Sequence, residues 1–198
     1  MQVTTRSAGT GPRKMRADAQ RNYEAIVATA RQVFSESGAN ASLDEIAKRA
    51  GVGPGTLYRH FPTRSDLHRA VLQDWMAEVE SEGDRIAAID DPEQSLMEWL
   101  RRYARYKNFF RGLHEALLEV PGDDDHSALA ECKALMTGIS ARIIERAKSA
   151  GLVREDVQPI TVCQMVSGIA FLVDRSPAGT VDVEAQLGII RAGIRPAA

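Results

Sequence analysis

Residues 42–61 of this 198-residue chain read SLDEIAKRAGVGPGTLYRHF, and this stretch decides the fold. Ser42 and Glu45 have the spacing of a capping box, in which a serine caps a helix and a glutamate three residues later reaches back to it. Apolar residues then follow at the spacing of one helix face: Leu43, Ile46, Ala47 and Ala50. The pattern predicts a short amphipathic helix that ends at Gly51, where glycine supplies the turn.

A second short helix is predicted from Pro54, because proline suits the first turn of a helix. Leu57 and Phe61 are four residues apart and should face inward, and Pro62 should end the helix. The side chains left to point outward or to the edge are those of Thr56, Tyr58, Arg59 and His60. Two short helices joined by a glycine turn form a helix-turn-helix unit when a third helix packs on them.

The residues before this unit predict that third helix, capped by Asp18 and ended by Gly38. Its apolar residues fall on one face: Tyr23, Ile26, Val27, Ala30, Val33 and Phe34. We therefore expect a helix-turn-helix domain over residues 17–64. Residues 1–16 are polar, basic and without periodicity, so they predict a flexible arm. It is interpreted either as a simple tail or as a basic arm that contacts DNA phosphates.

The charge is distributed unevenly along the chain. Residues 1–70 hold eleven Lys and Arg against six Asp and Glu, a net charge of +5, whereas residues 71–198 have a net charge of −7. A basic end joined to an acidic body predicts a polyanionic partner at one end only.

The outward face of the 54–60 helix suits double-stranded DNA, since a major groove admits one α-helix. Arg59 can fork onto a guanine edge, and Thr56 can bond a phosphate or touch a thymine methyl. Tyr58 and His60 suit phosphate contacts. Singly, Tyr58 could instead be a half-buried aromatic, His60 a surface histidine and Arg59 a solvated charge. The expected DNA-binding positions also include Gly53, Pro54, Gly55 and Arg64.

The 42–61 stretch resembles the signature of tetracycline-repressor (TetR) family regulators, in which a Gly-Thr-Leu-Tyr-x-His-Phe run forms the recognition helix. The similarity extends from about Ala19 to Met76. The resemblance implies that Ser42 caps its helix and meets a phosphate. It further implies that Thr56, Tyr58 and His60 touch the DNA backbone or thymines, and that the position of Arg59 varies with the operator. It also implies a C-terminal helical domain that dimerises through a four-helix bundle and often encloses a small ligand.

The rest of the chain keeps helical periodicity, so an all-α fold of about nine helices is expected. A linking helix over 63–85 begins at a second capping box, Thr63 to Asp66, and residues 86–198 form a regulatory and dimerisation domain. Within it, helices are expected from Pro92, over 109–119, 127–150, 159–175 and 183–194. The acidic run 121–125 is expected to be a solvated loop, and no metal site is expected there or with His126.

Aromatic and methionine residues gather in the body, which indicates either a plain hydrophobic core or a ligand pocket. The pocket candidates are Trp75, Trp99, Tyr103, Tyr106, Phe110, His114, Met136 and Phe171. The helix over 159–175 is apolar nearly all round and therefore needs a covering partner. The candidates for a dimer interface are Met165, Ile169, Leu187, Ile190 and Ile194.

These patterns predict a homodimeric, cytoplasmic repressor that binds a palindromic operator and is released by an unidentified small-molecule effector, without a cofactor. A regulator that responds to no ligand, or one that activates, is the alternative. An enzyme is not expected, because no catalytic triad spacing, phosphate loop or carboxylate pair is found. No apolar run approaches a membrane span, and the distant Cys132 and Cys163 are expected to stay reduced.

Overall fold

The computed structural model describes residues 12–37, 41–118, 123–177 and 179–196, and it describes side chains for 17–36, 41–106 and 130–196 apart from 178. Within these ranges every regular element is an α-helix. The eight helices are α1 (Pro12–Ser37), α2 (Leu43–Arg49), α3 (Pro54–His60), α4 (Arg64–Ala87), α5 (Pro92–Leu118), α6 (Asp123–Ser149), α7 (Pro159–Arg175) and α8 (Val183–Ile194). The predicted all-α class is confirmed.

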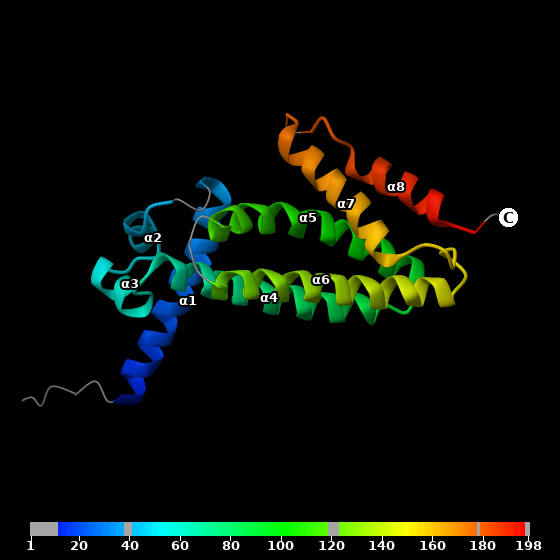
Figure 1. The fold of residues 1–198 in the computed structure, drawn as a ribbon. Coiled ribbons are helices and arrows are strands. Elements are labelled where there is room, and N and C mark those ends of the chain that lie inside the picture. Colours follow the sequence, from blue (N-terminus) through cyan, green and yellow to red (C-terminus); the bar gives the residue numbers. More distant parts are fainter. Residues whose placement is uncertain (1–11, 38–40, 119–122, 178, 197–198) are drawn as a thin grey trace, which may run out of the picture.

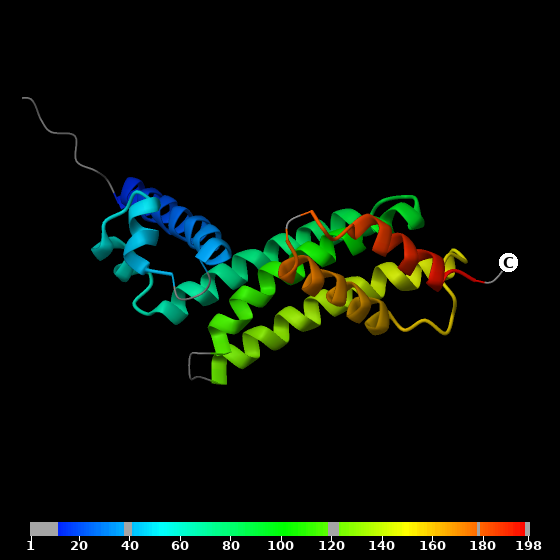
Figure 2. The same ribbon diagram turned by 90° about the horizontal axis from the view of Figure 1, so that it is seen from above.

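The helices form two parts that share α4 (Figure 1). At one end, α1, α2 and α3 pack around the first half of α4. Toward the other end, α4, α5 and α6 lie side by side as three long helices, and α7 and α8 cover α5 (Figures 1 and 2).

Two separate hydrophobic cores meet along α4. We call the first the reader core; from α4 it takes Leu67, Ala70 and Val71. The second, the body core, begins at the very next residue, Leu72, and continues with Trp75, Val79 and Ile86. Because adjacent residues of one rigid helix are buried in the two cores, a displacement of α4 must be felt in both.

Three boundaries differ from those predicted. Helix α1 begins at Pro12 rather than near Asp18, so residues 12–16 are helical; the rest of the proposed arm, residues 1–11, lies outside the described residues. Helix α5 runs unbroken to Leu118, where a separate helix over 109–119 was expected. No proline interrupts it, and a single Gly112 costs only about 1 kcal/mol within a helix. This fusion explains why eight helices are described rather than nine.

Helix α6 begins at Asp123, inside the run that was expected to be a loop. The side chains of Asp123 to His126 lie outside the described residues, so the expectation about metal binding there is not tested. None of the described helices is both long and apolar enough to span a bilayer.

Candidate functional site

The turn between α2 and α3 depends on Gly51, whose φ of +70° is a conformation that side chains rarely adopt. From there the chain enters α3 through Gly53, with Pro54 in the first turn as predicted. Leu57 and Phe61 are buried in the reader core and fix the inner face of α3. The unit is therefore a helix-turn-helix whose second helix is held by two apolar anchors.

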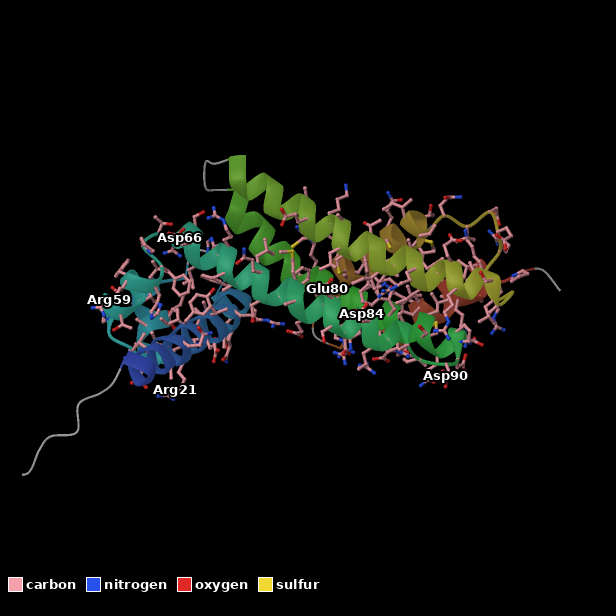
Figure 3. The ribbon with its side chains drawn as sticks, turned by 90° about the horizontal axis from the view of Figure 1, so that it is seen from below. Arg21, Arg59, Asp66, Glu80, Asp84 and Asp90 are labelled. Carbon is pink, nitrogen blue, oxygen red and sulfur yellow. The ribbon has the colours of Figure 1, made fainter. Side chains whose placement is uncertain are left out.

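The outer face of α3 carries the residues predicted to point away from the core. Tyr58 is 47% exposed, Arg59 is exposed, and Thr56 and His60 are half-buried. Arg59 lies at the extreme end of the molecule, away from the helical body (Figure 3). The predicted orientation is confirmed, whereas contact with DNA stays a prediction.

His60 is oriented by the aromatic side chains next to it. Its ring meets that of Tyr23 on α1 edge-on, with ring centroids 6.2 Å apart. Tyr23 in turn packs on Phe61 at 5.1 Å. The histidine is thus positioned by α1, which links the first helix to the outer face of α3.

The two predicted capping boxes have different outcomes. Ser42 is the N-cap of α2, but its side chain makes no capping hydrogen bond, so the predicted box with Glu45 is wrong. At α4 the box is confirmed, since Thr63 accepts from the Asp66 amide while the Asp66 carboxylate accepts from the Thr63 amide at 2.9 Å. The exposed Ser42 hydroxyl is consequently available to an outside partner such as a phosphate.

Arg64 has a structural role that its sequence position did not reveal. Its guanidinium donates to the carbonyl of Ala41 at 2.6 Å and is partly buried. This bond fastens the first turn of α4 to the residue before Ser42. Arg64 was expected to add charge for DNA, and in the structure it positions the helix-turn-helix on α4.

Four of the seven cations whose side chains are described in the reader part pair with acids: Arg21, Arg31, Arg49 and Arg69. Arg49 donates to Glu36 at 2.7 Å and meets Glu45 at 2.7 Å, and its hydrogen bond holds the pKa of Glu36 below the usual value. Lys48 and Arg59 make no ion pair with any of the described residues. Among the described side chains, the cations without an acidic partner therefore include one on α2 and one on α3. Acidic residues of the body, Glu80 and Asp84 among them, lie far from Arg59 (Figure 3).

Five of the eight pocket candidates gather in the body core: Trp75, Trp99, Tyr103, Tyr106 and Met136. The Trp75 and Tyr106 rings lie edge to face with centroids 5.9 Å apart, and Trp99 is 6.3 Å from both Tyr103 and Tyr106. The Trp99 indole nitrogen donates to the Ser140 hydroxyl at 2.9 Å. The side chains of Phe110 and His114 lie outside the described residues.

Phe171 does not join this cluster, although it was grouped with these residues in the sequence. It is 49% exposed on the outer face of α7, where Arg175 covers its ring at 4.6 Å. The helix is apolar on both faces, and the helical repeat alone cannot say which face turns inward.

The Tyr106 hydroxyl is buried and has no hydrogen-bond partner among the side chains and backbone that the structure describes. Burial raises the pKa of this phenol, and the nearby Glu78 and Glu82 raise it further. Burial likewise raises the pKa of Tyr103. Both phenols therefore stay neutral donors at physiological pH, and Tyr106 offers an unused polar atom inside an aromatic cluster.

The predicted dimer residues divide into two groups. Leu187, Ile190 and Ile194 are buried in the body core, and Ile169 is 6% exposed, so these four cannot form the outer surface by themselves. Of the five, only Met165 is widely exposed. The other exposed large apolar side chains of α7 and α8, none of which was assigned to the interface from the sequence, are Ile160, Phe171, Leu172 and Ile189. With Met165 they form an apolar face that we call the α7–α8 face.

A shallow groove of about 530 Å³ runs along the α7–α8 face between the two helices. Ile169 and Ile190 line its floor, and Met165, Leu172 and Ile189 form its walls. Four of the five predicted residues are thus buried, whereas the exposed apolar side chains of the same two helices form the α7–α8 face. Dimerisation through either set stays a prediction.

Comparisons with known proteins agree with this arrangement. Residues 26–71 match the family described as bacterial regulatory proteins, tetR family, and residues 91–196 match the C-terminal domain of SbtR-like transcriptional regulators. A helix-turn-helix regulator of Staphylococcus aureus (strain USA300) is 48% identical over 60 residues, which span 32% of that relative and 30% of this chain.

Solved structures match over nearly the whole chain. The TetR regulator from Streptomyces coelicolor is 32% identical with a TM-score of 0.74, covering 89% of this chain and 99% of that one. The TetR regulator from Mycobacterium vanbaalenii is 29% identical with a TM-score of 0.71, covering 92% and 99%. Both halves of the molecule, the reader and the helical body, are therefore those of one class of regulator rather than of an enzyme, and the chain belongs to the TetR family of transcriptional regulators.

Proposed function

We propose that this regulator is a homodimeric repressor that binds a palindromic operator through α3 and associates through the α7–α8 face. The observation that carries the proposal is that two surfaces on different parts of the molecule expose side chains suited to a partner. One is the outward row Thr56, Tyr58 and Arg59, and the other is the apolar α7–α8 face.

The α7–α8 face supports the dimer because large apolar groups that gather on one surface favour a protein partner. A second copy offers the same helices, so a two-fold axis can pair them as a four-helix bundle. Such a dimer must set its two recognition helices about 34–36 Å apart to read half-sites in successive turns of one DNA face. Two-fold symmetry then requires a palindromic operator.

Leu172→Asp is the variant that tests the dimer. It places a charge on the exposed face, so we expect a folded monomer with weakened operator binding. Ala134→Asp, at an exposed position of α6, is the matched control and should leave mass and binding unchanged. Sedimentation measures the mass of each variant, and operator titration measures its DNA affinity. The titration is done at fixed salt because DNA affinity falls steeply with ionic strength. A wild-type protein that sediments as a monomer at micromolar concentration would refute the dimer.

An effector that enters the aromatic cluster is the second element of the proposal. The unused Tyr106 hydroxyl favours a small, largely apolar molecule with one hydrogen-bond acceptor. Because Trp75 of α4 borders the cluster, such a molecule would displace the helix that carries the reader. About 1–3 kcal/mol of coupling lowers operator affinity five- to over a hundredfold.

Native mass spectrometry of the protein as purified, followed by operator titration before and after removal of any bound compound, tests the effector. A compound whose removal tightens operator binding supports repression released by ligand. Tight binding that no compound changes favours the ligand-independent regulator, and a transcription assay on operator DNA separates repression from activation.

A further inference from the structure

A cleft separate from the aromatic cluster lies where the end of α7 and the start of α8 come together over α5 (Figure 1). It encloses about 240 Å³. Arg101, Ala104 and Arg105 of α5 face it together because residues three and four apart share a helix face. Its apolar walls are Ala104, Ala170, Val173 and Val183.

The polar side of the cleft has more cations than anions. Arg101 donates from Nε to both carboxylate oxygens of Glu184, at 2.7 and 3.0 Å, and this bond raises the pKa of the guanidinium. Arg105 also lines the cleft and is exposed. It makes no hydrogen bond or ion pair within the portion of the chain that the structure describes, which leaves one guanidinium without a bonded carboxylate.

This chemistry identifies one class of ligand. A guanidinium can bind a carboxylate through two parallel N–H bonds. Arg101 uses only its Nε, which donates to both oxygens of Glu184. Alanine and valine walls beside the two arginines suit a short branched or aromatic group. The volume lies below the ~300–1,000 Å³ of pockets for drug-sized ligands, so the occupant must be small.

We propose that the cleft binds a small amphipathic monocarboxylate, which places its carboxylate on Arg105 and Arg101 and its apolar group among the alanines and valines. In the structure the carboxylate of Glu184 holds part of this position. The ligand and Glu184 therefore compete for Arg101, and binding releases the first turn of α8 from α5.

Release of Glu184 affects mainly the first turn of α8, because the last turn of the helix has its own contacts with α5. Glu93 of α5 pairs with Arg195 at 2.6 Å and Arg191 at 3.3 Å. Release of Glu184 would thus tilt the start of α8 about a fixed end. Since α8 also carries Ile189 of the α7–α8 face, the cleft is connected to the proposed dimer surface. Only this last step rests on the proposed function.

Isothermal titration calorimetry with isovalerate and benzoate tests the proposal, with isovaleramide and benzamide as neutral isosteres. The carboxylates should bind and the amides should not. Arg105→Gln should weaken carboxylate binding at least about tenfold, because it removes a charge-assisted pair. Glu184→Gln should strengthen binding severalfold because it removes the internal competitor. Arg142→Gln, which loses an equal charge at an exposed pair with Asp84, should change nothing.

Several results would overturn the proposal. These are no heat with either carboxylate at millimolar concentration, equal binding of acid and amide, equal weakening by Arg105→Gln and Arg142→Gln, or no gain from Glu184→Gln. Operator titration with and without isovalerate is a separate measurement. If the protein fails to bind operator, the proposed function fails, while calorimetry still decides whether the cleft takes a carboxylate.

Discussion

The packing of α4 on α6 depends on the absence of a side chain at Gly83. A Cβ at this position would lie 2.7 Å from Cδ1, 2.9 Å from Cγ2 and 3.2 Å from Cγ1 of Ile139. Ile139 is 6% exposed and β-branched, so its χ1 angle has little freedom to move away. In Gly83→Ala, therefore, either the isoleucine or the helix must shift.

The expected cost is the difference between two effects. Overpacking of a tight core destabilises by about 1–3 kcal/mol. Replacing a mid-helix glycine by alanine raises the free energy of unfolding by about 1 kcal/mol, because alanine has the higher helix propensity. Gly83→Ala should thus lower the free energy of unfolding by up to ~2 kcal/mol. Gly138→Ala on α6 has nothing within 4 Å of its new Cβ and should be neutral or more stable.

Urea unfolding of both variants, with operator titration in parallel, checks this expectation. Because α4 carries the reader core, Gly83→Ala should also weaken operator binding, whereas Gly138→Ala should not. Ile139→Ala removes all three crowded atoms, so the double variant should be more stable than the sum of the single losses predicts. A Gly83→Ala variant as stable as Gly138→Ala, or simple additivity in the double variant, would contradict the crowding at Ile139.

Three further outcomes are expected. Burial raises the pKa of Cys132 to about 12, so its thiol should stay protonated and resist iodoacetamide at pH 8 until the protein is unfolded by urea. Thr63→Ala should destabilise the protein by about 0.5–2 kcal/mol at neutral pH, measured by urea unfolding. The hydrogen bond from Thr63 lowers the pKa of Asp66 in the folded protein. Its contribution to the free energy of unfolding is therefore present above the unfolded pKa of about 3.9 and is lost as the pH falls through the lower folded pKa. The difference in stability between wild type and variant should shrink in acid. Arg59→Ala should cost about 1–3 kcal/mol per half-site and relax base preference in a selection assay, and an unchanged preference would make Arg59 a phosphate contact only.

The helix-turn-helix was predictable because its signals are local. Gly51, Pro54 and Pro62 set the turn and the limits of α3, and the spacing of Leu57 and Phe61 indicated its inner face. The same local reasoning failed at Ser42, whose neighbours fit a capping box that the chain does not form. It also missed Arg64, because the carbonyl it binds lies 23 residues away in sequence.

The sequence predicted most helices of the body but not which side chains of α7 and α8 are exposed. Helices α7 and α8 are apolar on two sides, and periodicity identifies faces without saying which one meets α5. The sequence therefore does not distinguish the burial of Leu187 from that of Leu172, yet Leu187 is fully buried and Leu172 is 49% exposed. The packing of α7 and α8 on the body decides which face is buried, and for α8 it includes the pair of Arg101 with Glu184.

The arrangement of the two cores explains how the ends of the molecule can influence one another. Val71 lies in the reader core and Leu72 in the body core, so no flexible segment separates the two along α4. Arg31 of α1 adds a second connection, since it pairs with Glu78 on the body half of α4. Tyr106 of α5 packs on Trp75 of α4 in the same region, where burial and then the charge of Glu78 raise the pKa of its hydroxyl. The effector proposed above, if it hydrogen-bonds Tyr106, would lie beside Trp75 of α4 and near the acid that pairs with α1, so both connections between the body and the recognition helix are close to its site.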